Sequence, residues 1–562
     1  MSTITADEVA LESPPVPFAS RVQLLRFLAA LIILVSGGLR IAYLTWPGAL
    51  DLVQDESHYW DWSRHPDWSY YSKGPLVAYL IGGSCYLTES WSQAMTGNAM
   101  LSVRLPAVLC GGLLLCSLYV LTTLVYRREV LALCVVALAA VMPPVAAASL
   151  MMTIDAPYIC CWSWALVFGY LALFRERRWA WPAAGLMIAL GLLAKQTMVL
   201  WVPSLMLFLY FTPGWRRHLC RPGFWVMAFV GALGSVPILV WNYQNDWVTL
   251  KHLLGHTGAK QPIHLLGPFN YIAMQFVTLL GYWFAVWCAG MWIYRPWRSA
   301  SSAAGRSEDS PNCDELRYLW WMSAPTFFFF MAFSLKNGGG ELNWPVTAYL
   351  SGLVLAGGWV AQRIMDPRPR RRREARIGLT LIVGLGFGLT LLMHDFSLIY
   401  PLLSRISGSP TTENIVPMRR LDPTSRLRGW RTLAAEVDRI RDELKQEGVE
   451  PVIAADRWTM PGAIGFYCQG HPTVYSFGPV FGDRHSQYDL WHPNPLADPE
   501  AFRGRTFILV VESVEPLWES FEQIGELKMV MHYQRGEPIS RWLVTVARGY
   551  RGTTKKMSSG NF

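Results

Sequence analysis

Apolar runs long enough for a helix to cross a bilayer, about 17 to 25 residues, recur along this 562-residue chain. Only 16% of the residues are charged, compared with about a quarter in soluble proteins. The sequence therefore predicts a polytopic α-helical membrane protein. On the bilayer template we identify about eleven membrane-spanning helices, near residues 27–46, 103–125, 130–148, 156–174, 179–194, 197–213, 223–241, 268–294, 318–335, 345–362 and 377–394.

The charges between these runs predict how the chain is oriented in the membrane. Basic residues gather in short blocks, which include "YRREV", "FRERRW", "GWRRHLCR" and "DPRPRRRREAR". Loops rich in Lys and Arg stay on the cytoplasmic side, so we expect these blocks and the N-terminal tail, residues 1–24, to be cytoplasmic. The remaining loops then lie on the outer side. Because the net charge of +9 reflects such topological blocks, we exclude nucleic acid as a partner.

The chain changes character after His394. Residues 395–562 are more charged and mix two periodicities: Leu433, Val437, Ile440 and Leu444 share one face of a predicted helix, while "VIAAD" and "TFILVVES" are typical of short strands. An odd number of spans exports this segment, so we predict a C-terminal extracytoplasmic α/β domain. Its polar stretch "FGDRHSQYDLW", which contains Arg484, either forms a solvated loop or recognises an acceptor.

The first outer loop, residues 47–101, contains the sequence "LVQDESHYWDWSRHPDWSYYSKGPL". Asp55 and Glu56 are adjacent, so they cannot both face one point in a regular helix or strand. Among aromatic residues that include Tyr59 and Tyr71, a carboxylate in a partly dry setting has a raised pKa and can act as a general base. The alternative is an interfacial loop in which the aromatics form the membrane belt and the acids are solvated.

Further polar residues fall on the same outer side. Asp155 in "MMTIDAPY" lies between two spans, where an acid either has a partner or caps the next helix. Lys195 in "LLAKQTMVL" either snorkels to the surface or binds an anion, and Lys73 in "YYSKGPL" either binds an anion or lies in a solvated turn. Glu341 and Asn343 follow a glycine run, which lets the backbone approach a ligand or forms a flexible turn.

Separated acids and lysines on one face of a membrane trunk suit a reaction with a base and an anionic leaving group, and a lipid-borne phosphate is the natural anion there. Five ordered motifs, "QDESHYW", "YYSKGPLVAYL", "ASLMMTIDAPY", "LGLLAKQTMVLW" and "GELNWPVTAYL", resemble those of the C-type (GT-C) membrane glycosyltransferases of the protein O-mannosyltransferase and lipid A aminoarabinose transferase superfamily. The resemblance covers roughly residues 25–365. It implies a GT-C transmembrane catalytic domain over residues 25–394, with the outer loop 47–101 as its catalytic part.

The resemblance also implies catalytic and binding roles for individual residues. Asp55 looks like the general base, Glu56 is its neighbour in the Asp-Glu motif, and Asp155 is similar to a second catalytic acid that orients acceptor or sugar. Lys73 and Lys195 match lysines that hold the donor phosphate, in agreement with the need for fixed cations at a developing negative charge. The other candidates for substrate contact are Tyr59, Tyr71, Glu341 and Asn343.

The implied activity is the transfer of a sugar, with inversion, from a polyprenyl-phosphate-sugar donor to a lipid, protein or glycan acceptor at the outer face. Neither a nucleotide-sugar site nor an obligatory metal is required, and a divalent cation stays an open alternative. The sequence contains no N-x-S/T sequon, which favours a bacterial inner membrane and a periplasmic C-terminal domain. The alternative function is a transporter of polyprenol phosphate or lipid-linked sugar, which also needs intramembrane lysines and acids.

Two stretches depart from the family pattern. Gly74 stands where the family's Lys-Pro-Pro motif has its first proline, which predicts a less rigid loop beside Lys73. The segment "GGGELNWPV" differs from the basic or His-containing segment that aminoarabinose transferases tend to have. The resemblance therefore leaves the sugar and the acceptor unidentified.

Overall fold

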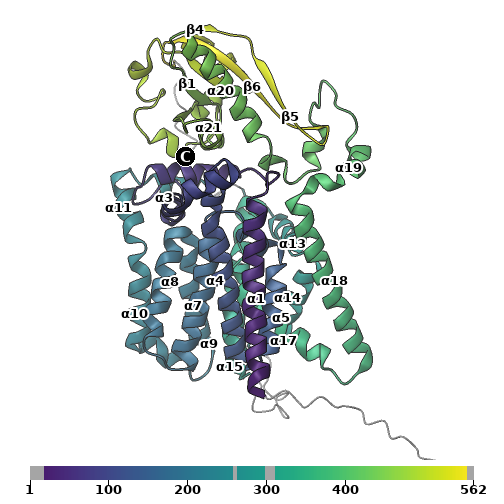
Figure 1. Cartoon of the computed structure of the whole chain (residues 1–562). Coiled ribbons are helices and arrows are strands. Elements are labelled where there is room, and N and C mark those ends of the chain that lie inside the picture. Colours follow the sequence, from purple (N-terminus) through teal and green to yellow (C-terminus); the bar gives the residue numbers. More distant parts are fainter. Residues whose placement is uncertain (1–17, 257–261, 298–310, 554–562) are drawn as a thin grey trace, which may run out of the picture.

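The structure is a computed structural model that describes residues 18–256, 262–297 and 311–553. A trunk of long helices carries a smaller α/β domain at one end (Figure 1). Helix α1 (Phe18–Leu44) begins inside the segment predicted as the N-terminal tail, residues 1–24, and residues 1–17 lie outside the described part of the chain.

The rest of the trunk is helical with short connections. Its helices are α4 (Met100–Tyr126), α5 (Glu129–Ala140), α6 (Pro143–Ala148), α7 (Asp155–Phe174), α8 (Ala180–Ala194), α9 (Trp201–Phe211), α10 (Pro222–Leu233), α11 (Val236–Gln244), α12 (Val248–His256), α13 (Gly267–Thr278), α14 (Tyr282–Ile293), α15 (Cys313–Trp321), α16 (Ala324–Asn337), α17 (Ala348–Ile364) and α18 (Pro369–His394). Among the described residues, six helical segments are long and apolar enough to cross a membrane, or up to seven if α13 and α14 form one broken span.

Helices lie at each of the predicted spans, so the polytopic helical fold is confirmed, but their continuity differs from the expectation. The predicted span at 130–148 is divided into α5 and α6, because Pro143 and Pro144 start a new helix. Helices α13 and α14, which cover the predicted span at 268–294, are bent by 113°. Helices α5, α8 and α9 are shorter than a full span. The number of crossings therefore stays a prediction.

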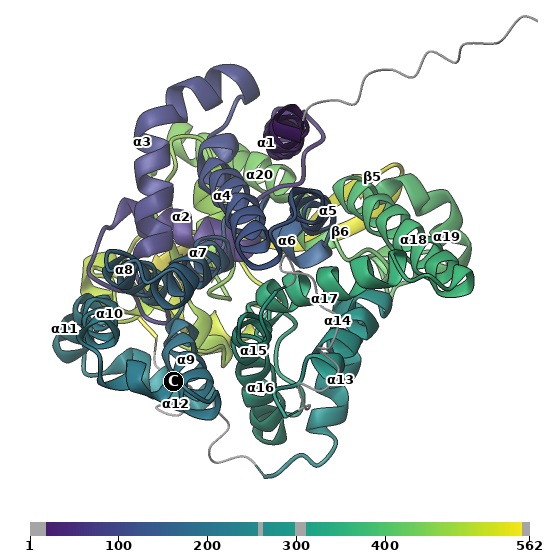
Figure 2. The ribbon, with the colours of Figure 1, turned by 90° about the horizontal axis from the view of Figure 1, so that it is seen from below.

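The outer segment 47–101, expected to be a loop, is largely helical. It contains α2 (Gln54–Arg64) and the 21-residue α3 (Leu76–Thr96), which lies across the bundle rather than along it when seen from below (Figure 2). Helix α3 exposes large apolar side chains, including Tyr86, Leu87 and Trp91. Polar residues between these side chains lower the hydropathy of α3, which is why an apolar-run criterion misses it.

The C-terminal domain contains a six-stranded mixed sheet in the order β2-β1-β3-β6-β4, with β5 paired to β6. Strands β1, β2 and β3 are parallel, whereas β6 runs antiparallel to β3, β4 and β5. The strands are β1 (Val452–Ala455), β2 (Val474–Ser476), β3 (Phe507–Val510), β4 (Phe521–Ile524), β5 (Lys528–Gln534) and β6 (Glu537–Tyr550). The helices of this domain are α19 (Tyr400–Ser407), α20 (Trp430–Gln446) and α21 (Pro461–Tyr467).

Helix α20 packs on the sheet with the face that the sequence periodicity predicts. Leu433, Val437, Ile440 and Leu444 are all buried, and they form one core with residues of β1 and β3. A second core, which contains aromatic residues such as Phe507, lies on the other side of the sheet. The domain thus has two hydrophobic cores of its own.

The C-terminal domain rests on α2 and on the residues just before it. Gly462 at the start of α21 lies so close to α2 that a Cβ atom there would be 2.6 Å from the carbonyl oxygen of Ser57. Asp51 accepts a hydrogen bond from the backbone N–H of Trp430 at 3.0 Å and pairs with Arg431 at 3.0 Å. Helix α2 is therefore held between the trunk and the C-terminal domain.

Candidate active site

Asp55 and Glu56 lie side by side in the first turn of α2 but point into different surroundings. The side chain of Asp55 is accessible to solvent, whereas Glu56 is 0% exposed. Adjacent residues of a helix point about 100° apart, so only one of the two can face a ligand. The N-terminus of a helix also favours a negative charge, which stabilises both carboxylates in this turn.

Glu56 is occupied by bonds within the protein. Its two carboxylate oxygens accept hydrogen bonds from Arg104 of α4 at 2.9 and 2.7 Å, and Arg104 is itself 1% exposed. The backbone N–H groups of Val53 and Met152 also donate to Glu56, at 2.9 and 2.7 Å. This arrangement fixes α2 to α4 and to the turn before α7. We assign Glu56 a positioning role, in place of the direct catalytic role expected from the sequence.

Three of the predicted site residues meet at the start of α7. Asp155 pairs with the ammonium group of Lys195 at 2.8 Å, and its other oxygen accepts a hydrogen bond from Asn343 at 2.5 Å. Lys195 follows the last residue of α8, is 6% exposed and lies over the ring of Tyr158. The sequence left a helix cap and a partnered acid open for Asp155, and the structure shows a partner.

Lys73 lies on the loop between α2 and α3, and its ammonium group forms no hydrogen bond or ion pair with any described residue. Burial, followed by the nearby charge of Lys195, lowers its pKa to about 8. The next residue explains the position of this loop. A Cβ atom on Gly74 would lie 2.2 Å from the carbonyl oxygen of Leu193, so glycine is needed for the loop to reach the end of α8. The close packing of this backbone against α8 therefore explains why a glycine follows Lys73, where a Lys-Pro-Pro motif has a proline.

The electrostatic environment of Asp55 is mixed. Although the carboxylate is accessible, protein surrounds it on most sides, and this burial raises its pKa. The positive charges of Lys73 and Arg484 act in the opposite direction, while Asp155 raises the pKa further. An accessible carboxylate with a raised pKa, close to cations but not paired with them, can accept a proton from a substrate hydroxyl.

Arg484 comes from the C-terminal domain, where the sequence allowed either a solvated loop or an acceptor contact. Its guanidinium group lies 3.9 Å from the ring centroid of Trp458, whose ring is 5.2 Å from that of His58 on α2. Burial lowers the pKa of Arg484, and the electrostatic effect of Arg484 on Asp55 and Tyr59 places it at the edge of the site. Nothing in the single sequence links residue 484 to residue 55.

Two aromatic residues of the segment 47–101, Tyr59 and Tyr71, are close to these charged groups. Tyr59 lies one turn after Asp55 and is buried, and burial raises its pKa well above the usual value. Tyr71 is also buried; its backbone N–H donates to Gln487 of the C-terminal domain at 2.7 Å, while its hydroxyl has no hydrogen-bond partner among the described residues. Glu341 is exposed, and its carboxylate forms no hydrogen bond or ion pair with a described residue.

No group of three or more His, Cys, Asp and Glu side chains that could hold a metal ion is found in the described ranges. The charged groups that converge on the site are instead one accessible acid, the ion pair of Asp155 and Lys195, the unpaired Lys73, and Arg484. Such a set can accept a proton and stabilise an anion within the same site.

Comparisons with known proteins agree with this fold. Residues 72–241 match the family described as dolichyl-phosphate-mannose-protein mannosyltransferase. The lipid A galacturonosyltransferase RgtD of Rhizobium johnstonii is 27% identical over 326 residues, which cover 55% of this chain and 60% of that relative. The crystal structure of ArnT from Cupriavidus metallidurans in the apo state superimposes with a TM-score of 0.58 and 14% identity, over 92% of this chain and 97% of ArnT.

The match over residues 72–241 begins beside Lys73 and includes Asp155 and Lys195, so it covers much of the candidate site. The likeness to ArnT extends over nearly the whole chain and shows the fold, including a C-terminal sheet region on a helical trunk. The chain therefore has the GT-C fold, and part of its sequence is similar to membrane glycosyltransferases, among them the protein O-mannosyltransferase family.

Proposed function

We propose that this protein transfers a sugar from a polyprenyl-phosphate-sugar donor to an acceptor at the extracytoplasmic face of the membrane, with inversion at the anomeric carbon. The observation that carries the proposal is the accessible carboxylate of Asp55, which has a raised pKa and is close to the unpaired cation Lys73. A base beside an unoccupied cation suits a displacement in which a proton is taken up and an anion leaves.

In the proposed reaction, Asp55 accepts the proton of the acceptor hydroxyl as its oxygen attacks the anomeric carbon. The bond from that carbon to the phosphate oxygen breaks, and its electron pair stays with the polyprenyl phosphate. Protonated Asp55 then returns its proton to solvent. The base and the leaving phosphate lie on opposite sides of the sugar, so inversion follows from a single displacement.

Fixed cations stabilise the leaving phosphate in this scheme. Lys73 is the first of them, because its ammonium group has no partner among the described residues. Lys195 contributes its charge from the ion pair with Asp155, and Arg484 contributes from the C-terminal domain. Charges held in place before the reaction need no reorganisation when negative charge develops, which is why such groups accelerate it.

The membrane orientation is part of the proposal. Helix α7 begins at Asp155 in the site and, with 20 residues at about 1.5 Å each, leads to the other end of the trunk. The arginines at positions 175, 177 and 178 follow its last turn, and a cytoplasmic position for them places the site and the C-terminal domain outside. We propose the inner membrane of a bacterium and a periplasmic C-terminal domain. The lipid A acceptor named for the relative RgtD makes a lipid the first acceptor to test.

The proposal is tested with the purified full-length protein in lipid and a panel of polyprenyl-phosphate sugars. We expect release of free polyprenyl phosphate from at least one donor, and loss of this release in Asp55→Asn. The matched control is Asp246→Asn, an exposed acid after α11 with a positive φ of 52° that asparagine also adopts readily. Transport of an intact labelled carrier across vesicles, without any donor cleavage, would establish the transporter alternative instead.

We further expect the reaction to need no metal ion, since the residues proposed to stabilise the phosphate are themselves cations. Donor cleavage should be unchanged after exhaustive treatment with EDTA. Loss of activity that Mg²⁺ or Mn²⁺ restores would show that a divalent cation takes part.

A further inference from the structure

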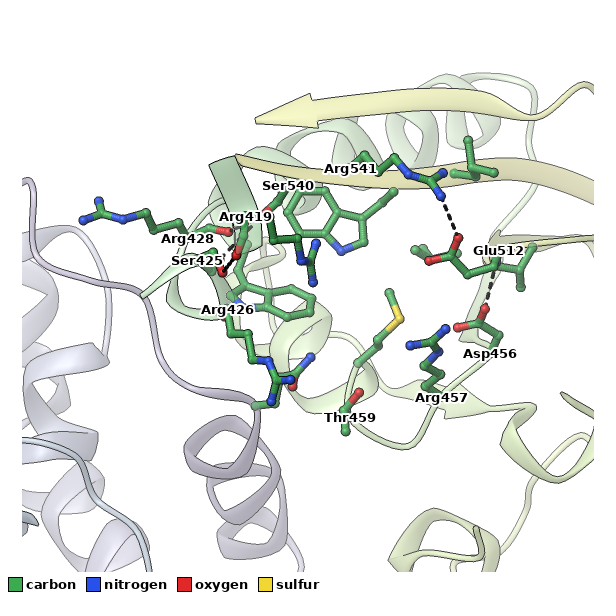
Figure 3. Close-up of a pocket in the computed structure, with 17 residues that line it drawn as sticks. Arg419, Ser425, Arg426, Arg428, Asp456, Arg457, Thr459, Glu512, Ser540 and Arg541 are labelled. Carbon is green, nitrogen blue, oxygen red and sulfur yellow. Dashed lines mark hydrogen bonds and ion pairs between the residues drawn. The ribbon is translucent and has the colours of Figure 1, made fainter. Parts of the chain in front are cut away.

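A second concave site lies between the C-terminal domain and α2. It is an open cavity of about 80 Å³, lined mainly by residues of the C-terminal domain (Figure 3). The trunk contributes Gln54, the first residue of α2 and the neighbour of Asp55. Because adjacent helix residues point about 100° apart, one turn of α2 borders both this cavity and the candidate active site.

The cavity is strongly basic. Five arginines and only two carboxylates, those of Asp456 and Glu512, line it. Glu512 pairs with Arg541 at 3.5 Å, and Asp456 accepts a hydrogen bond from the backbone N–H of Glu512 at 2.7 Å. Both carboxylates are thus engaged beside one another at one side of the cavity (Figure 3). Arg428 is directed toward Asp422 at 3.6 Å.

The other three arginines, Arg419, Arg426 and Arg457, form no side-chain hydrogen bond or ion pair with any residue in the described ranges. Arg419 and Arg457 approach the cavity from different sides in Figure 3. Burial, and then the charge of Arg426, lower the pKa of Arg419. Glu512 raises this pKa, while Arg457 and Arg541 lower it further, so these guanidinium groups are close enough to repel one another. Three arginines without a partner among the described residues, beside two carboxylates that are already engaged, favour a bound anion.

The remaining lining suits a ligand that is more than a simple ion. Trp430 and Trp542, whose rings are 5.6 Å apart, provide apolar surface next to the guanidinium groups. Ser425, Ser540 and Thr459 add hydroxyl groups. Guanidinium groups that can bind phosphate in a bidentate manner, together with aromatic and hydroxyl surfaces, fit a phosphorylated sugar headgroup.

We propose that this arginine-lined cavity binds a phosphate group of the acceptor and thereby directs an acceptor hydroxyl to Asp55. The acceptor role rests on the proposed glycosyl transfer. In the proposed transfer, the cations near Asp55, above all Lys73, bind the donor phosphate. The cavity is a different place, because it lies on the C-terminal domain and meets the trunk at Gln54. Donor and acceptor then have separate anion sites on either side of the base.

The test measures binding to the full-length Asp55→Asn protein in detergent, which keeps the cavity but cannot turn over. Inorganic pyrophosphate is the first probe, titrated by calorimetry. The double variant Arg426→Gln/Arg457→Gln should weaken its affinity about tenfold or more, because each lost bond is to a charged group. The control is Arg420→Gln, an exposed arginine beside Arg419 that does not line the cavity. It should leave the affinity within about twofold of the parent.

Lipid probes then separate a lipid headgroup from a free anion. Mixed micelles with lipid A that carries its phosphates should displace pyrophosphate, and micelles with dephosphorylated lipid A should not. Displacement by neither lipid would overturn the acceptor assignment, and equal pyrophosphate affinity in the double variant would overturn the site itself. Arg426 and Arg457 are exposed, so the variants should fold; the single variant Arg457→Gln repeats the test with a smaller change.

The outcome is independent of the test of the proposed function. If phosphate binds in the cavity but no donor is cleaved by the wild-type protein, the glycosyltransferase proposal fails and the anion site stands. If donor cleavage depends on Asp55 while the cavity binds neither pyrophosphate nor phosphorylated lipid, the glycosyltransferase proposal stands and the anion site fails.

Discussion

Asp55 and Lys73 lie close enough to affect each other's pKa, but they do not form an ion pair. A direct salt bridge would stabilise both charged forms and occupy both groups. Apart, each keeps the property that the proposed reaction needs: the carboxylate can take a proton, and the ammonium group can meet a phosphate. Asp155 and Lys195 differ from them in this respect, since they form a direct ion pair at 2.8 Å.

The pH dependence of donor cleavage follows from these two groups. Asp55 acts in its deprotonated form, so activity should rise as the pH increases through its pKa, which lies above the usual 3.8. Lys73 acts in its protonated form and has a pKa of about 8, so activity should fall above that pH. Initial rates in wild-type protein should therefore give a bell-shaped profile.

Lys73→Arg checks the assignment of the alkaline limb, because a guanidinium group stays charged at any accessible pH. The limb should move to higher pH in this variant. An unchanged alkaline limb would mean that another group causes it.

Glu56 and Arg104 form the most deeply buried ion pair of the site, and we expect it to matter for stability rather than for chemistry. Removing one partner leaves a buried charge without compensation, so Glu56→Gln should lower the free energy of unfolding by about 3–5 kcal/mol. The control is Glu89→Gln on helix α3, at a residue that is not buried. It should change the free energy of unfolding by no more than about 0.5 kcal/mol. Denaturant unfolding in detergent measures both values.

The double variant Glu56→Met/Arg104→Met provides a further check on this pair. Since it removes both charges together, it should cost less than the sum of the two single changes. Additive costs would show that the two side chains do not act as a pair.

At the scale of elements, the loop between α2 and α3 is placed by the contact of Gly74 with α8. In Gly74→Ala the new methyl group would overlap the carbonyl oxygen of Leu193, so the loop and Lys73 should shift. A displacement of about 1 Å at a reacting group can reduce a rate by roughly a hundredfold. We expect a loss of donor cleavage on the order of tenfold to a hundredfold, together with a higher KM for the donor.

Gly83→Ala on α3 serves as the comparison for this variant, because a Cβ atom there meets nothing within 4 Å. Its kinetics should match the wild type. Equal effects of the two substitutions would show that the contact with Leu193 does not set the position of Lys73.

Local sequence signals predicted some elements and missed others, for physical reasons. Apolar runs located the helices of the trunk, since burial in lipid demands them over a whole span. The same criterion missed α3, in which polar residues are interspersed among the apolar ones. It also placed α5 and α6 in one span, although Pro143 and Pro144 divide them. The period of apolar residues predicted the buried face of α20, because that helix packs on a single sheet.

At the scale of the whole molecule, the C-terminal domain supplies part of the charge around Asp55. Arg484→Gln removes a cation that lowers the pKa of Asp55, so the acidic limb of the pH profile should move to higher pH. Donor cleavage should also fall by roughly tenfold or more, as when one fixed group that stabilises a transition-state charge is removed. The shift of the acidic limb is the diagnostic result, since a merely structural change would not produce it.

Arg484→Lys keeps the charge and should restore the acidic limb. Arg503→Gln, an exposed arginine that pairs with Glu500 elsewhere in the domain, should leave the whole profile unchanged. A wild-type profile in Arg484→Gln would place that side chain outside the site.

Contacts between distant parts of the chain were beyond the reach of the single sequence. The motifs pointed to Asp55, Asp155 and Lys195 as members of one site, and the structure brings the last two into contact. The single sequence could not pair Glu56 with Arg104, because that contact depends on how α2 and α4 pack within the trunk. Nor could it place Arg484 near Asp55, because that proximity depends on how the C-terminal domain packs on the trunk. A pattern of residue types records local preference, whereas these contacts exist only in the assembled fold.

The position of α2 between two cores has an evolutionary consequence. Ser57 is packed against Gly462 of one domain, while Glu56, the residue before it, is bonded to Arg104 of the other. A chimera that joined this trunk to the C-terminal domain of a relative would need a matching small residue at position 462, or helix α2, which carries Asp55, would be displaced. The two domains therefore cannot diverge independently at this helix, and a new C-terminal domain must preserve the same close contact with α2.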